Sequence, residues 1–159
     1  MFCMTPVPIV AAINLEGWPA MRKSDLNRLK KEAYMRVGKI WLKKMLPAHF
    51  RAGAASKYGY EPRSLRHNRR KRAIFHHTQP LVFTGALKRE VLSPAGHSVS
   101  ATSKGARVRL HHHVVHRKVH EELIAVTEPE RRELSAVFTN ELARLMKTFK
   151  GKRRRKLRK

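Results

Sequence analysis

The segment HSVSATSKGARVRL, residues 97–110, decides the fold class. Apolar and polar residues alternate on both sides of its centre, which is the pattern of a strand with one buried face. The centre, Ser103-Lys104-Gly105, suits a tight turn. The segment therefore predicts an antiparallel hairpin. The residues that share its buried face are Val99 and Ala101 in the first run and Val108 and Leu110 in the second.

A long helix is predicted before the hairpin, starting at Ser24 or Asp25 and running to about Leu46. Apolar residues recur there at steps of three and four, and basic residues fill the other face. Pro47 marks the expected end. The apolar stripe consists of Leu26, Leu29, Ala33, Val37, Ile40, Trp41 and Met45.

A second long helix is predicted after the hairpin. Thr127-Glu128-Pro129-Glu130 is a strong helix start, because threonine caps, glutamate follows three residues later and proline is tolerated in the first turn. Residues 114–126, between hairpin and helix, are expected to be extended, either pairing with the hairpin or forming a loop. The apolar face of the helix consists of Leu134, Val137, Phe138, Leu142, Leu145, Met146 and Phe149.

These elements predict an α+β fold in one domain, residues 21–149, with a long N-terminal helix, a small antiparallel sheet and a C-terminal helix. Residues 51–79 carry Gly, Ser and Pro with little periodicity, and we expect an extended, flexible basic loop there. Residues 150–159 form a basic tail. Residues 1–20 form an apolar segment, which we call the arm. We expect the arm to be either disordered or docked on a neighbouring subunit.

The charge of the chain is its most unusual property. Lys+Arg number 36 against 11 Asp+Glu, a formal net charge of +25. Such a charge calls for an anionic partner, which could be nucleic acid, an anionic membrane or an acidic protein surface. No apolar run reaches the roughly 20 residues that cross a bilayer. No amphipathic anchor adjoins the basic tail, so we expect no membrane partner.

Two basic segments are the candidate sites for binding nucleic acid or a partner protein. Lysine and arginine contact phosphates without reading sequence, and Tyr58 and Tyr60, close to the first segment, could stack on bases. The predicted binding residues are Arg63, Arg66, Arg69, Arg70, Lys71 and Arg72 in the loop, and Lys152, Arg153, Arg154, Arg155 and Lys156 in the tail.

The segment PLVFTGALKREVL, residues 80–92, directly follows the first basic stretch. Leu81 and Phe83 would share one face of a short strand, and Thr84 would cap the turn that follows. A short helix would come next and would end at residues 93–96. This unit would anchor the basic stretch and project it toward a neighbouring subunit or DNA.

Catalysis and metal binding are poorly supported. No nucleophile elbow, P-loop or dinucleotide fingerprint occurs, and Asp25 is the one aspartate. No cysteine or well-placed acid completes a tetrahedral zinc set around the clustered histidines. We therefore predict no enzymatic activity, no cofactor and no metal site. The clustered histidines are His111, His112, His113, His116 and His120.

The order HF, KYGYEPRS, RKR and PLVFTGALKREVL resembles the virion-morphogenesis proteins of tailed bacteriophages, a group with tail-completion and head–tail joining members. Its signature corresponds here to Pro80, Leu81, Val82, Thr84, Gly85, Leu87 and Lys88. The resemblance covers roughly residues 45–115 by motif. The histidine run and the very basic C-terminus depart from the group's pattern.

The resemblance implies a small α+β structural protein without catalytic residues, located in the virion and forming a ring at the neck or at the tail terminus. Its implied partners are copies of itself, portal, adaptor or tail-tube proteins, and packaged DNA. Charge alone supports a different class, a sequence-nonspecific nucleic-acid-binding protein that acts through the basic loop and tail.

Overall fold

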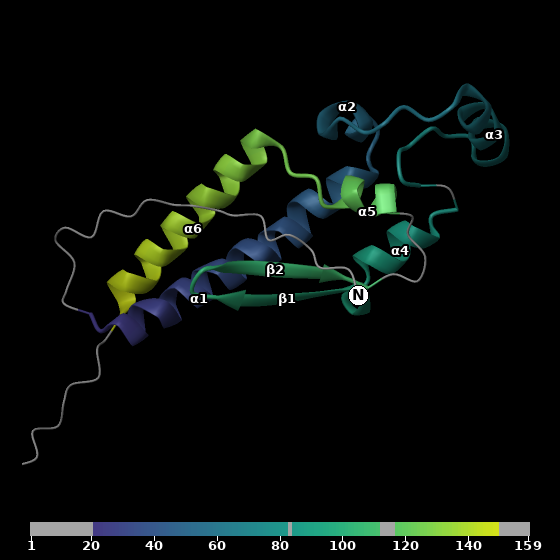
Figure 1. Cartoon of the computed structure of the whole chain (residues 1–159). Helices are drawn as coiled ribbons and strands as arrows, with labels where there is room; N and C mark the ends of the chain where they lie inside the picture. The colour runs from purple at the N-terminus through teal and green to yellow at the C-terminus, as the bar shows by residue number, and fades with distance from the viewer. Residues whose placement is uncertain (1–20, 83, 112–116, 150–159) are drawn as a thin grey trace, which may run out of the picture.

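The computed structural model describes residues 21–82, 84–111 and 117–149 (Figure 1). Helix α1 (Lys23–Ile40) lies at the centre and packs against helix α6 (Glu128–Thr148) and against a hairpin of β1 (His97–Thr102) and β2 (Gly105–Leu110). The α+β class is confirmed, with the long N-terminal helix, the small antiparallel sheet and the C-terminal helix all present.

Helix α1 buries the predicted stripe. Leu29, Ala33 and Val37 are buried on it, whereas Leu26 and Ile40 are only half-buried. The chain then continues through a π turn, η1 (Trp41–Met45), and a 3-10 turn, η2 (Leu46–Phe50). Pro47 lies in the first turn of η2. Proline is tolerated there, because a backbone N–H in the first turn makes no hydrogen bond within the helix. The helical path is therefore longer than predicted.

The hairpin packs closely against α1. Val99 pairs with Val108 and Ala101 with Ala106, and the two-residue turn is Ser103–Lys104. A Cβ atom at Gly38 would lie 2.6 Å from Val99 Cγ1. Gly38 is thus the position that lets the helix backbone approach the sheet, since any side chain there would push the hairpin away.

Helix α6 begins at the predicted capping box. The Glu130 carboxylate accepts a hydrogen bond from the Thr127 backbone N–H at 3.1 Å, and Pro129 lies in the first turn. Farther along, Phe138 stacks on Tyr34 of α1 with 4.2 Å between ring centroids. The buried face is Leu134, Phe138, Leu142 and Met146.

The prediction of an extended loop over residues 51–79 is wrong. Two helices form there, α2 (Ala54–Tyr58) and α3 (Leu65–Phe75). Glycines 53 and 59 bracket α2 with φ angles of 81° and 66°, so the glycines punctuate a helix rather than a coil. Helix propensity outweighed the repulsion between exposed like charges in α3, because arginine, lysine, leucine and alanine are good helix formers.

Two further predictions of extended structure are wrong. Leu81 has a φ angle of 58°, which no strand residue adopts, and Phe83 lies outside the described residues. Residues 117–123, expected to be extended, form helix α5 (Arg117–Leu123). The short helix after Gly85 is confirmed as α4 (Ala86–Leu92), followed by a 3-10 turn, η3 (Pro94–Gly96). None of the described helices is long and apolar enough to cross a bilayer.

Candidate functional site: the basic helix and the groove beside it

Helix α3 turns the first basic stretch into an ordered surface. The Ser64 hydroxyl accepts a hydrogen bond from the His67 N–H at 3.2 Å, which satisfies one of the free donors of the first turn. The helix ends at His76, whose φ angle of 56° places it in the left-handed region. Both ends are therefore set by local sequence, and Figure 1 shows α3 standing away from α1 and α6.

Four arginines cover the solvent side of α3, and we call this surface the arginine face. Residues three and four apart are neighbours on a helix, and these four follow that spacing. All four side chains are exposed, and none has an ion pair within the described residues. This face can therefore offer several guanidinium groups to an anionic surface at once. Its members are Arg66, Arg69, Arg70 and Arg72.

The other two predicted residues of this stretch do not belong to that surface. Arg63 precedes α3 and forms an ion pair of 2.5 Å with Glu122 of α5. Lys71 is only 5% exposed, and its ammonium group donates a hydrogen bond to the Gln79 carbonyl oxygen. Lys71 is therefore not part of the exposed basic surface, because its position on α3 turns it inward.

Lys71 carries a charge in an unfavourable setting. Burial lowers the pKa of Lys71, and the positive charge of Arg63 lowers it further. No carboxylate of the described residues forms an ion pair with it. A buried ammonium without a counter-ion is costly, so Lys71 favours any anionic group that can reach it.

The motif segment, residues 80–88, and Lys71 line the same groove. Pro80, Leu81 and Val82 line this groove, as do Thr84, Gly85 and Leu87, while Lys88 is exposed on α4 and does not line it. The Thr84 hydroxyl accepts a hydrogen bond from the Ala86 N–H at 3.3 Å, close to the predicted cap. Gly85 has a φ angle of 79°, the conformation that favours glycine at this turn.

The groove has a volume of about 890 Å³. Its other walls come from the segment before α3, with Tyr60 and Pro62, and from Val119 of α5. Arg63, Lys71 and His77 supply nitrogen donors along it. The structure thus brings the segment of residues 80–88 and part of the basic stretch together, although the sequence suggested only that one anchors the other.

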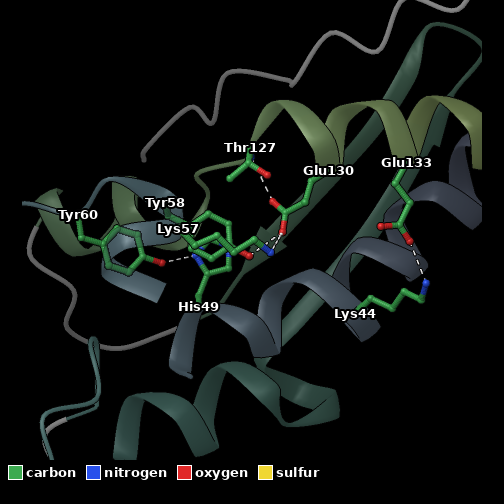
Figure 2. Close-up of polar contacts among 8 residues, drawn as sticks. All are labelled: Lys44, His49, Lys57, Tyr58, Tyr60, Thr127, Glu130 and Glu133. Atoms are coloured by element: carbon green, nitrogen blue, oxygen red, sulfur yellow. Dashed lines mark hydrogen bonds and ion pairs between the residues drawn. The ribbon is translucent and has the colours of Figure 1, made fainter. Parts of the chain in front are cut away.

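The two tyrosines near the basic stretch are not available for stacking on bases. Tyr58 stacks on the buried His49 ring with 3.8 Å between centroids, and Tyr60 is hydrogen-bonded through its hydroxyl to His49 Nδ1 (Figure 2). Tyr60 is itself buried. These aromatic side chains are core of the α2 region, and the prediction of a base-stacking role for them is wrong.

Glu130 joins this cluster to α6. Its carboxylate accepts hydrogen bonds from Lys57 Nζ at 2.5 Å and from the Tyr58 hydroxyl at 2.7 Å (Figure 2). Burial acts to raise the pKa of Glu130, but the bonds from Lys57, Tyr58 and the Thr127 N–H together lower it. Burial also lowers the pKa of His49 to about 4 and raises that of Tyr58 to about 12.

Replacing Glu130 with glutamine should destabilise the fold by about 1.5–3 kcal/mol at pH 7, since the charged acceptor of several hydrogen bonds is lost. Because folding lowers the pKa of Glu130, its contribution is complete above the unfolded value of 4.5 and disappears as the pH falls through the folded value. Urea unfolding from pH 7 to pH 3 should therefore show a shrinking difference between wild type and Glu130→Gln.

Glu133 supplies the matched control for this variant. It lies three residues farther along α6 and forms an ion pair of 2.8 Å with Lys44, but both side chains are largely exposed (Figure 2). Glu133→Gln should cost less than about 1 kcal/mol at every pH. Equal losses for the two variants would contradict the role given to Glu130.

The other predicted sites lie only partly within the described residues. Residues 152–156 and three of the clustered histidines, 112, 113 and 116, lie outside the described residues. Of the remaining two, His111 is hydrogen-bonded to the Ser98 hydroxyl at 3.2 Å and His120 lies on α5. In the described part of the chain, no three His, Cys, Asp or Glu side chains gather as a metal site would require.

Sequence reasoning missed the importance of His49, Lys57 and Glu122. The capping box identified Glu130 as a cap residue, but nothing in the sequence indicated its partners 72 and 73 residues away. An aromatic-rich stretch, HF followed by KYGY, was the one visible sign of a buried cluster.

No family model, no curated protein and no solved structure matches this chain.

Proposed function

We propose that this chain is a structural virion protein of a tailed bacteriophage, which forms or completes the head–tail neck or the tail terminus as an oligomeric ring. Its proposed partners are further copies of itself, portal, adaptor or tail-tube proteins, and packaged DNA. It acts in the virion, after assembly in the host cytoplasm, and without catalysis or a cofactor.

The observation that carries this proposal is the unfinished sheet. Antiparallel pairs alternate between inward and outward backbone groups. With the two-residue turn, Ala101–Ala106 and Val99–Val108 turn their N–H and C=O groups outward. No backbone hydrogen bond joins these groups to another described element.

A two-stranded sheet whose edges pair with no other described strand invites a further strand. A second chain could supply one by strand addition, which gives main-chain hydrogen bonds without a dedicated pocket. Repeated around a closed symmetry axis, a heterologous contact of this kind makes a ring. The resemblance of residues 80–88 to the virion-morphogenesis signature supports the same conclusion.

Light scattering coupled to size exclusion in high salt tests the proposal. High salt screens phosphate contacts, whereas sheet and apolar interfaces persist. We expect a discrete multimer free of nucleic acid, either alone or after mixing with a portal or tail-tube ring. A chain that stays monomeric at high concentration and ignores both rings would contradict the ring proposal.

A second candidate function rests on the arginine face. A sequence-nonspecific nucleic-acid-binding protein would use these four exposed guanidinium groups, together with the basic tail, to contact phosphates. The two functions are compatible in a protein that surrounds packaged DNA. They make different predictions for the salt dependence of binding.

A further inference from the structure

The groove beside α3 has the chemistry of a site for a carboxylate surrounded by apolar side chains. Lys71 is buried, and within the described residues its ammonium group has one hydrogen-bond partner, the Gln79 carbonyl oxygen. The Nδ1 atom of His77, which also lines the groove, is buried without a partner in the described part of the chain. Both nitrogens could be satisfied by an acidic group that enters the groove.

The walls around these nitrogens are largely apolar. Tyr60, Leu81 and Val82 line one part of the groove, and Leu87 and Val119 line another. Glu61 also lines the groove and makes a contact of its own, and Glu122 pairs with Arg63; within the described residues, neither forms an ion pair with Lys71. The fitting ligand is therefore a peptide with one carboxylate between apolar residues.

The arm of this chain has that composition. Residues 1–20 contain one charged residue, Glu16, within the sequence INLEGW. Glu16 is also the one acidic side chain outside the described residues. We propose that the groove of one copy receives residues 13–18 of a neighbouring copy, with the Glu16 carboxylate paired to Lys71. This inference rests on the proposed oligomeric assembly.

The length of the chain favours a neighbour over the same copy. Glu16 precedes the start of α1 by seven residues (23 − 16), which span at most roughly 25 Å. Helix α1 has 18 residues and is about 27 Å long. The groove lies beyond its other end, because Figure 1 shows α2, α3 and α4 beside the C-terminal end of α1. The arm of the same copy therefore falls short.

Burial favours a peptide over DNA as the occupant. Lys71 is 5% exposed, and a duplex backbone is too wide to follow an ammonium group into an apolar groove. The guanidinium groups that a duplex can reach lie on the opposite side of α3, on the arginine face. The two sides of one helix thus separate a protein contact from a phosphate contact.

A double-mutant cycle in the full chain tests the pair. Sedimentation velocity in high salt would compare wild type, Glu16→Gln, Lys71→Met and the double variant. Each single change should weaken assembly on the order of 30-fold or more, because it leaves the other charge buried and unpaired. The double variant should assemble no more weakly than the worse single one. Lys88→Met, which removes an exposed lysine from the same motif, should assemble like wild type.

Carbodiimide cross-linking identifies the copy that supplies the arm. In a one-to-one mixture of ¹⁵N-labelled and unlabelled chains, amide bonds between Glu16 and Lys71 should join chains of different label in about half of the cross-linked peptides. Cross-links confined to chains of one label would overturn the exchange of arms between copies.

The stability of the monomer supplies an independent readout. Lys71→Met replaces a buried charge with an apolar side chain of similar length, so the dilute chain should unfold no earlier on heating than wild type. A lower midpoint for Lys71→Met would show a structural role for the lysine and would overturn its role in docking.

The possible failures are distinguishable. A wild-type chain that never assembles would remove the proposed function itself. Assembly that is unchanged in all variants would leave the ring in place and overturn the docking of the arm. Loss of duplex DNA affinity in Lys71→Met, matching that of variants in the arginine face, would show that the groove binds phosphate and would overturn the peptide as its occupant.

Discussion

Replacing all four arginines of the arginine face with glutamine is expected to reduce the salt dependence of duplex DNA binding by about 3.6 in the log–log slope. Each phosphate contact releases counterions and contributes about 0.9 to that slope. The loss of four such contacts therefore reduces the slope by about four times 0.9. The affinity at low salt should fall by several orders of magnitude, which is the largest functional effect that we expect from any described surface.

Fluorescence anisotropy with a duplex of arbitrary sequence, titrated over a series of salt concentrations, measures this slope. The matched control removes the same charge from the outer side of the hairpin and α1, by glutamine at Lys39, Lys104, Arg107 and Arg109, all of which are exposed. The control should lose much less. Equal losses would mean that overall charge, and not the arginine face, governs binding.

Phe138→Ala is expected to lower the free energy of unfolding by about 3–5 kcal/mol, the largest structural effect that we expect. Phe138 is among the largest fully buried side chains, and it stacks on Tyr34 where α6 meets α1. Its truncation removes the stacked ring and leaves a cavity between the two longest helices, which cannot close around an alanine.

Chemical unfolding monitored by circular dichroism would measure this loss. Thr139→Ala changes the next residue, which is exposed and bonds only the Ser135 carbonyl oxygen of its own helix. It should stay within about 0.5 kcal/mol of wild type. A loss below 1 kcal/mol for Phe138→Ala would place the core elsewhere than at the α1–α6 contact.

Local sequence predicted the elements whose signals are themselves local. The capping box at Thr127 and Glu130 gave the start of α6, and the alternation over residues 97–110 gave the hairpin with its turn. The stripe on α1 was visible because its period is that of a helix. In each case, the residues that carry the signal lie within a few positions of one another.

Helices α2 and α3 could not be recognised in the same way. Glycines and prolines suggested a coil, but the glycines at 53 and 59 end a short helix on both sides. Residues 65–75 show no apolar period, since the inward residue of α3 is a lysine. Periodicity identifies a helix by its apolar face, and a helix that buries an ammonium group escapes that test.

Only part of the candidate site could be predicted, because the contacts that complete it join residues that are distant in sequence. The basic stretch and the motif were both found, but their meeting across a groove depends on where α3 and Leu81 turn the chain. Likewise, the removal of Arg63 from the basic surface depends on Glu122, 59 residues away. Pairings at such distances in sequence leave no local signal.

The projecting position of α3 has a consequence for how the protein opens. Helix α3 packs little against α1, the hairpin or α6, whereas those elements share one core. A segment with few buried contacts opens at a lower free energy than the core does. The amide hydrogens of α3 should therefore exchange with solvent through local opening, while those of α1 exchange only when the whole domain unfolds. Helix α3, which carries the arginine face, could then change its conformation on an irregular anionic surface while the core of the protein stays folded.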